Sequence, residues 1–459
     1  MKKTFTSTLL ILFFAAQAYA VVDTSEFVHR TTAKELADLA RSIKQDSKSH
    51  AAAGGNGKGV DLKQAVNAVN TLVQNNGDIK SVIGDGTQST ARTQGNAAFA
   101  VNELTIKLYK ETSDGNKNLF LSPYSISTAL AMVYAGAKGE TAKEMEQALG
   151  FSPAVHSSMH SLISRINSIS PKSAQLHTAN AIWPSSDKNI FESYKARVSS
   201  DYFSEVTTLD YAKTEEARQT INKWVENKTN GKIKDIVSKG SISNNTPLAI
   251  TNAIYFKSDW QSKFESHLTK KANFYTANGK TTKTNFMNQT GFFNYVKKDG
   301  IELLELPYKD ERLSMYIILP QSGHFASAEK ALSTEQIDNL ITQTVRTNIH
   351  ISLPKFKMEG NYNLNDTLKT LGVTTAFTDN ANFSGMNGLL DISLGVVLHK
   401  TFIDVYEAGT EAAAATYVGM KSMALPQRPL EFKADRPFIF LIRDNATGVN
   451  LFIGRYIKP

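Results

Sequence analysis

The sequence contains no cysteine, and this absence removes several kinds of chemistry at once. Its 459 residues cannot form disulfides, bind zinc through thiolates, hold an iron–sulfur cluster or use a cysteine nucleophile. A strong charge of one sign is also lacking. The chain has 51 Lys and Arg against 43 Asp and Glu, and its basic residues are scattered rather than clustered. We therefore expect no nucleic-acid partner.

The sequence also lacks the common enzymatic motifs. It has no Gly-x-Ser-x-Gly, no His-Glu-x-x-His and no Gly-x-Gly-x-x-Gly after a strand. His156 and His160 are four residues apart, but no Glu lies between them, so a solvated helix face explains this pair better than a metal site. We expect neither an enzyme nor a bound metal or cofactor. A serine–histidine pair distant in sequence stays open, because catalytic triads are assembled in space.

Residues 1–20 have the organisation of a secretory signal peptide. Lys2 and Lys3 give a positive start, Leu9–Phe14 form a short apolar core, and Ala18–Ala20 is a small-x-small cleavage signal. No later segment has about 18 uninterrupted apolar residues, so we expect no transmembrane segment. A secreted chain without cysteine suggests an exported bacterial protein, in the periplasm or outside the cell.

The remaining chain divides near residue 95. Within 21–95, Thr32–Lys44 has helical apolar spacing and Ala51–Gly59 has the composition of a flexible linker. Val60–Thr90 contains no aromatic residue and can bury little apolar surface. We interpret 21–95 as a low-complexity, partly helical N-terminal extension.

From residue 96 onward, helical patterns come first and β patterns dominate later. Ser125 is expected to cap the second helix, and Thr141 begins a capping-box pattern. This order favours an α+β fold with large antiparallel or mixed sheets. The expected helices include 126–136, 141–149 and 216–227, and the expected strands are 249–257, 313–319, 348–357, 396–406, 438–443 and 450–457.

The segment after the strand 396–406 cannot be assigned to a helix, a loop or a strand from its residue pattern alone. Its four consecutive alanines favour a helix, whereas Gly409 and Gly419 favour a loop. With a period of two it is also a possible half-buried strand, because one face is uncharged and no proline occurs before Pro426. That uncharged face consists of Thr410, Ala412, Ala414, Thr416, Val418 and Met420. An Ala-rich linker or helix stays open.

This segment resembles the hinge of inhibitory serpins. The hinge residues are Glu407, Gly409, Thr410, Glu411, Ala412, Ala413, Ala414, Ala415 and Thr416. Phe432–Phe440 resembles the serpin signature, and Asn118–Ser127, Thr251–Lys257 and Phe452–Arg455 resemble further family blocks. The resemblance covers residues 96–459, which is one full serpin domain, and leaves the extension 21–95 without an assigned role.

The resemblance implies an α+β fold with three β-sheets, eight or nine helices and an exposed reactive-centre loop. It also implies a monomeric, metastable inhibitor that forms a covalent acyl complex with its target serine protease when the cleaved loop inserts into the central sheet. Non-inhibitory serpins, which act as carriers, chaperones or storage proteins, are the main alternative. Thr410 and the four alanines argue against it, because those members typically carry bulky, charged or proline residues in the hinge.

The resemblance further implies which bond of the reactive-centre loop the target protease would cleave. Fourteen residues after Gly409 stands Met423, so the scissile bond is expected between Met423 and Ala424. An apolar, unbranched side chain suits elastase-, chymotrypsin- or subtilisin-like proteases. Lys421, which would attract trypsin-like enzymes, and Leu425 are alternatives, and papain-like cysteine proteases stay open as targets.

Two supporting clusters are also implied by the resemblance. A polar shutter, which would hold the central sheet closed, consists of Ser122, Ser125, Asn252 and His399. A breach, where the loop would begin to insert, consists of Trp260 and the ion pair between Lys355 and Glu407. Taken without the motif, His399 would more often be a satisfied core histidine.

Overall fold

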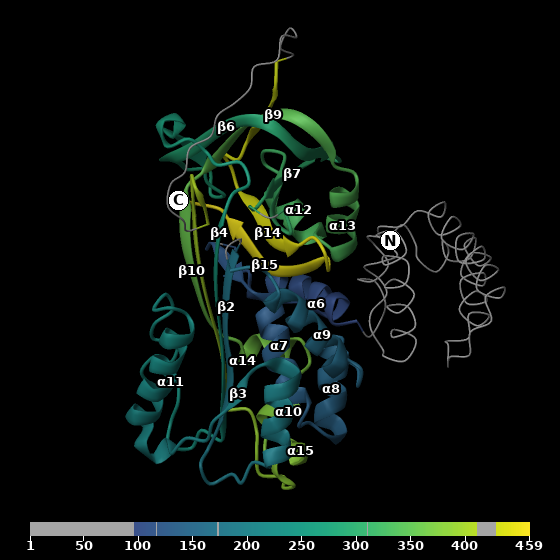
Figure 1. Ribbon diagram of the computed structural model, residues 1–459, viewed down its shortest axis with the longest axis vertical. Helices are drawn as coiled ribbons and strands as arrows, with labels where there is room; N and C mark the ends of the chain where they lie inside the picture. Colours follow the sequence, from purple (N-terminus) through teal and green to yellow (C-terminus); the bar gives the residue numbers. More distant parts are fainter. Residues whose placement is uncertain (1–95, 116, 172–173, 310, 411–427) are drawn as a thin grey trace, which may run out of the picture. The chain divides into compact units, whose positions relative to one another are not determined.

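The computed structural model describes residues 96–459 except 116, 172–173, 310 and 411–427 (Figure 1). The expected signal peptide and the extension 21–95 therefore lie outside the described residues. The same holds for hinge residues 411–416, for the bait residues Met423 and Ala424, and for the alternatives Lys421 and Leu425.

Ten α-helices and three short 3₁₀ segments occur in the described residues. The first five helices of the domain gather in the lower half of Figure 1, and the first two of them contact the last strand of the chain. The α-helices are α6 (Ala97–Thr112), α7 (Pro123–Tyr134), α8 (Gly139–Leu149), α9 (Val155–Asn167), α10 (Glu192–Tyr202), α11 (Thr214–Lys228), α12 (Phe325–Ala331), α13 (Thr334–Thr342), α14 (Asn365–Thr370) and α15 (Ser384–Asn387); the 3₁₀ segments are η1 (Tyr211–Lys213), η2 (Ser266–Leu268) and η3 (Thr375–Phe377).

The larger sheet has nine strands, in the order β1-β15-β14-β8-β7-β6-β9-β13, with β5 paired to β6. Every pairing in it is antiparallel except that of β13 with β9. Its strands are β1 (Leu119–Leu121), β5 (Lys270–Tyr275), β6 (Thr281–Lys298), β7 (Ile301–Pro307), β8 (Leu313–Pro320), β9 (Val345–Pro354), β13 (Leu430–Lys433), β14 (Phe438–Asp444) and β15 (Val449–Tyr456).

The smaller sheet has six strands, in the order β10-β11-β12-β4-β2-β3. Two of its long strands, β11 and β4, run parallel and pair directly from Val396 opposite Ala249 to Phe402 opposite Tyr255. Beyond that point the two-residue strand β12 lies between them. The strands are β2 (Ala174–Pro184), β3 (Glu205–Val206), β4 (Leu248–Asp259), β10 (Phe356–Asn363), β11 (Val396–Tyr406) and β12 (Gly409–Thr410).

Helix α7 occupies the centre of the molecule, and all twelve of its residues are buried. It contacts β2 and β4 of the smaller sheet and β15 of the larger one. The helix is capped by Ser122, whose hydroxyl accepts a hydrogen bond from the Ser125 amide, and Pro123 takes the first helical position. The expectation that Ser125 caps this helix is therefore wrong by three residues.

Other boundaries differ from expectation for local reasons. The apolar run 348–357 was expected as one strand, but Lys355 separates β9 from β10, which belong to different sheets. Helix α8 begins before the expected capping box, and the Thr141 hydroxyl accepts a hydrogen bond from the Asn382 amide instead of capping its own helix. By contrast, β11 matches the expected strand 396–406 residue for residue.

The described strands form two hydrogen-bonded sheets, where the resemblance implies three, and the ten described α-helices are one more than the upper figure of nine. The long strand β6 explains the sheet count. Its first residues pair with β5, its middle with β9 and its end with β7, so two groups of strands belong to one continuous ladder.

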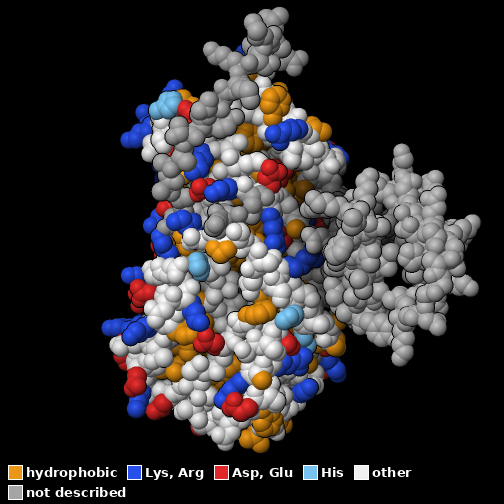
Figure 2. Space-filling model, in the orientation of Figure 1, with side chains coloured by type: hydrophobic (Ala, Val, Ile, Leu, Met, Phe, Trp, Pro, Cys, Tyr) orange, Lys and Arg blue, Asp and Glu red, His pale blue; other side chains and the backbone are white. Residues whose placement is uncertain are grey.

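The surface carries both signs of charge. On the face shown in Figure 2, Lys and Arg side chains are interspersed with Asp and Glu over the described part of the chain. Among the described helices, none combines the length and the apolar character needed to cross a bilayer.

Candidate functional site: the hinge strand and the seam of the central sheet

The hinge begins where β11 ends. After Tyr406 the chain turns through Glu407 and Ala408 and comes back as β12, with Gly409 and Thr410 between β11 and β4. Thr410 pairs with Val405 on one side and with Ser258 on the other. Two residues of the expected hinge, Gly409 and Thr410, are therefore already part of the sheet.

Gly409 has no room for a side chain. An added Cβ would overlap the Ser258 carbonyl oxygen and the Asp259 backbone. Glycine at this position lets the returning chain lie directly against β4, which any L-residue would prevent.

Thr410 is fully buried, and its hydroxyl is satisfied there. Its Oγ1 lies 2.9 Å from the Tyr308 hydroxyl oxygen. Tyr308 is itself buried and stacks on Trp260, with ring centroids 4.6 Å apart and planes 10° from parallel. Burial raises the pKa of Tyr308 far above its ordinary value, so this hydroxyl stays protonated and available for a hydrogen bond.

The expected breach residues surround this turn. The Trp260 indole donates to the Tyr406 carbonyl at 3.0 Å, and the Trp260 amide donates to the Ala408 carbonyl at 2.9 Å. Lys355 Nζ lies 2.7 Å from Glu407 Oε2, while the Thr269 hydroxyl donates to Glu407 Oε1 at 2.7 Å. Burial alone would raise the pKa of Glu407, but these hydrogen bonds from Lys355 and Thr269 lower it below its ordinary value.

The expected shutter residues also meet, halfway along the seam between β11 and β4. His399 stands directly opposite Asn252, and its Nδ1 hydrogen-bonds the Asn252 side-chain oxygen. Its Nε2 accepts a hydrogen bond from the Ser122 amide at 3.1 Å. Because a backbone amide can only donate, the ring is neutral, with its proton on Nδ1. Burial lowers the pKa of His399 to about 3, in agreement with this state.

The network extends to helix α7 and to β2. Asn252 Nδ2 donates to Ser125 Oγ at 2.5 Å and also to Asn180 Oδ1, while Ser125 Oγ donates to Asn180 Oδ1 at 3.0 Å. The Ser122 hydroxyl donates to the Leu451 carbonyl at 2.7 Å. All four expected shutter residues are therefore joined through hydrogen bonds that cross the seam.

Asn180 was missed by the sequence reasoning. It stands opposite Asn252 in β2, so that Asn180, Asn252 and His399 form one row across three strands. A polar residue inside an apolar strand is a signal that could have found it, because buried amides need partners.

The two helical histidines do not form a metal site. His156 is half-buried rather than solvated: Nδ1 hydrogen-bonds the Tyr202 hydroxyl, and burial lowers its pKa to about 4. Only His160 is exposed, as expected. Within the described part of the chain, no group of three or more His, Asp or Glu is arranged to hold a metal ion.

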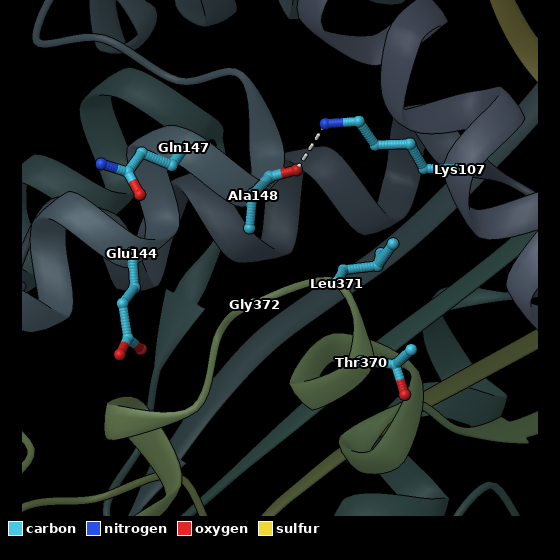
Figure 3. A pocket seen from close by; sticks show the side chains of 7 residues that line it. All are labelled: Lys107, Glu144, Gln147, Ala148, Thr370, Leu371 and Gly372. Carbon is cyan, nitrogen blue, oxygen red and sulfur yellow. Dashed lines mark hydrogen bonds between the residues drawn. The ribbon is translucent and has the colours of Figure 1, made fainter.

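A surface pocket of about 370 Å³ lies among α6, α8 and the end of α14 (Figure 3). Its two charged side chains are already held by the fold. Lys107 Nζ donates to the Ala148 carbonyl at 2.9 Å, and Glu144 accepts hydrogen bonds from the amides and hydroxyls of Thr374 and Thr375. We interpret these contacts as connections between elements rather than as a ligand site.

The comparisons with known proteins agree with this geometry. A family model described as "Serpin (serine protease inhibitor)" matches residues 99–459. An uncharacterized serpin-like protein of Thermococcus kodakarensis is 42% identical over 366 residues, which cover 78% of this chain and 85% of that protein. A leukocyte elastase inhibitor of Xenopus laevis is 39% identical over 377 residues, which cover 79% of this chain and all of that protein.

Solved structures resemble the described fold as well. Serpin48 of the insect Tenebrio molitor, described as a highly specific serpin, has a TM-score of 0.72 and 31% sequence identity. The match covers 79% of this chain and 98% of that chain. The family model and these relatives assign the α+β domain to one family. The chain is a member of the serpin family.

Proposed function

We propose that this serpin is a secreted suicide-substrate inhibitor of serine proteases. The observation that carries the proposal is the hinge strand itself. Gly409 and Thr410 already lie between β4 and β11, so the sheet has an opening at the point where a longer strand would enter. The rest of the hinge, from Glu411 to Thr416, has no proline and mostly small side chains, which suits insertion.

The covalent step follows from ordinary serine protease chemistry. The protease serine oxygen attacks the Met423 carbonyl carbon, and the bond between Met423 and Ala424 breaks. The Ala424 amine leaves with a proton from the protease histidine, and Met423 stays attached to the protease as an ester. Insertion of the loop then competes with hydrolysis of that ester by water.

Met423 determines the class of target in this proposal. A long apolar side chain fills the hydrophobic primary pocket of elastase-, chymotrypsin- and subtilisin-like enzymes. The similarity to a leukocyte elastase inhibitor supports this choice over a trypsin-like target, which would require cleavage after Lys421.

A panel of proteases tests the proposal. The purified protein is mixed with elastase, chymotrypsin, subtilisin, trypsin and papain, and each mixture is run on a denaturing gel. We expect a stable band at the summed mass with one of the first three, and none with the same protease inactivated at its serine. A band with papain would redirect the proposal to cysteine proteases, whereas simple cleavage by every enzyme would favour a non-inhibitory serpin.

Export is the second part of the proposal. Residues 1–20 would be removed after Ala20, so the mature chain would begin at Val21. Expression in a bacterium with fractionation, followed by N-terminal sequencing, tests this. A protein that still begins with Met1 and is found in the cytoplasmic fraction would contradict export.

A further inference from the structure

Strands β6, β9 and β13 form one end of the larger sheet, and β6 and β9 cross the top of Figure 1. Successive side chains of a strand point to opposite faces of a sheet, so these three strands have two faces. One face packs against the core, and its buried members are Phe293, Tyr295, Ile349, Ile351, Leu353 and Phe432. The opposite face, which we call the outer face, consists of Thr290, Phe292, Arg346, Asn348, His350 and Glu431.

Phe292 is the one large apolar side chain among these six, and it is 61% exposed. It stands opposite Asn348, with Arg346 and His350 as its diagonal neighbours on the same face. The neighbouring row is held without it, since the Thr290 hydroxyl lies 2.9 Å from His350 Nδ1. The ring of Phe292 therefore adds little to the core, and only a partner could remove it from water.

Phe292 is not an isolated exposed residue. Val345 begins β9 and Leu430 begins β13, and both side chains are exposed as well. Three of the eight exposed large apolar side chains in the described residues thus border one end of this three-stranded unit. Apolar side chains that gather at one place on a surface are typical of an interaction site, whereas scattered ones are not.

The outer face lies where the chain comes back to the sheet after the reactive-centre loop. The described chain resumes at Arg428, two residues before β13. Because β13 runs parallel to β9, the chain enters β13 from the end of the sheet at which β9 begins. Phe292 is one row nearer to that end than Gly291, which shares the row of Leu430. The chain that leads into β13 therefore passes the row of Phe292.

The bond proposed as the reactive bond is close enough for one protease to reach both places. Leu430 stands seven positions after Met423, and an extended chain of that length covers at most about 25 Å. Leu430 and Phe292 are two strands apart, which is about 10 Å. A protease of about 230 residues has a radius of gyration of about 17 Å and is about 40 Å across. We infer that the target protease, while it holds Met423 in its primary pocket, also contacts Phe292 and Arg346 of the outer face.

This inference rests on the proposed function, and the outer face indicates what the protease must present. Phe292 suits an apolar patch, and the exposed Arg346 guanidinium suits a carboxylate beside that patch. Glu431 stands in the row of His350, so it would repel a carboxylate placed on that side of Phe292. Such a second contact speeds the association with the protease, whereas Met423 still determines which bond is cleaved.

Association kinetics of the intact protein test the apolar part of the contact. Phe292→Ser is mixed with elastase, chymotrypsin and subtilisin, and the second-order rate constant of complex formation is measured for each. The protease that gives the covalent band should react at least fivefold more slowly, while the melting temperature of the uncleaved protein stays the same. The matched control is Phe191→Ser, since Phe191 is 46% exposed and precedes α10 in the lower half of Figure 1.

Salt dependence tests the charged part of the contact. Arg346→Ala should slow complex formation about threefold at low ionic strength and should make the rate less dependent on salt. Lys223→Ala removes the same charge from an exposed position of α11, away from the outer face, and should leave the salt dependence unchanged.

Binding of inactive proteases separates this inference from the proposed function. The three proteases, each with its nucleophilic serine replaced by alanine, are titrated against the unaltered protein and against Phe292→Ser. If no active protease gives a covalent complex but an inactive one binds Phe292→Ser at least fivefold more weakly, the contact stands and the inhibitory function fails. Complex formation at the unaltered rate in both Phe292→Ser and Arg346→Ala would overturn the inference, and so would an equal loss in Phe191→Ser. Neither a covalent complex nor binding with any of the three would overturn both proposals.

Discussion

Lys355 Nζ lies 2.7 Å from Glu407 Oε2, and this ion pair ties the junction between β9 and β10 to the residue at which the chain leaves β11. The Glu407 side chain is 10% exposed and that of Lys355 is 37% exposed, so water weakens the attraction without removing it. The pair therefore stabilises the turn that leads into the hinge strand.

Glu407→Gln should lower the free energy of unfolding of the uncleaved protein by about 0.5–1 kcal/mol at pH 7. Because the pKa of Glu407 is lowered in the folded state, the carboxylate stabilises the protein above its ordinary pKa, and this contribution is lost as the pH falls through the folded-state pKa. Urea unfolding at pH 7 and pH 3 measures the effect. Glu140→Gln, in an exposed pair with Lys143, should change little, and an equal effect of both variants would contradict the prediction.

Acidification should weaken the sheet through His399. Its pKa is lowered to about 3 by burial, so below its ordinary pKa the unfolded chain binds a proton that the folded protein excludes. Stability should therefore fall by up to about 1.4 kcal/mol per pH unit between roughly pH 6 and pH 3. His399→Gln should be less stable at pH 7 but should show a flatter pH dependence in this window.

Half-buried His156 also contributes to the loss of stability in this pH range, because burial lowers its pKa to about 4. His156→Gln measures that share separately and is the control for the His399 variant. A pH profile of His399→Gln that runs parallel to that of the unaltered protein would show that His399 is not the responsible group.

Thr410→Arg should convert the inhibitor into a substrate. The side chain at 410 is fully buried between β4 and β11, and an arginine there would bury an unpaired charge at the first row of insertion. The covalent complex should fall at least tenfold while cleavage of the loop continues, as a gel and a titration of residual protease activity can measure. Arginine at exposed Thr281 is the control, and undiminished complex formation by Thr410→Arg would contradict loop insertion.

Cleavage of the loop should raise the melting temperature by about 10 °C or more. A new strand would add ladder hydrogen bonds on both sides, each worth about 1 kcal/mol, along the whole seam between β11 and β4. Calorimetry of the protein before and after nicking, with cleavage confirmed by mass spectrometry, measures the change. Equal melting temperatures would mean that the native state is not strained.

Met423→Arg should shift inhibition from elastase-like to trypsin-like proteases, because arginine pairs with a carboxylate at the floor of a primary pocket. The change in relative inhibition rate should exceed tenfold. Mass spectrometry of the released peptide gives the independent check, since it should begin at Ala424 and end at Pro459. A peptide that begins at Ser422 or Pro426 would show that the protease cleaves after Lys421 or after Leu425 instead.

The sequence alone was sufficient for the fold class and for the strand β11, because the relevant signals are local. The run from Val396 to Tyr406, which is rich in Val, Ile, Phe and Tyr, predicted β11 with its correct ends, because a strand buried on both faces needs apolar residues along most of its length. The resemblance supplied His399, Asn252, Ser122 and Ser125 as one group, and the described structure joins them through hydrogen bonds.

Only the tertiary structure decided which partners close these networks and where the hinge lies at rest. Asn180 hydrogen-bonds with the expected shutter residues because β2 pairs with β4 at that row. Tyr308 lies 102 positions before Thr410 in the chain, and its stacking on Trp260 places its hydroxyl beside the Thr410 hydroxyl. Such pairings depend on strand register across long separations in the chain, which local patterns do not contain. The sequence thus determined that a strand could form after Glu407, whereas packing against Ser258 and Tyr308 decided that its first two residues already have.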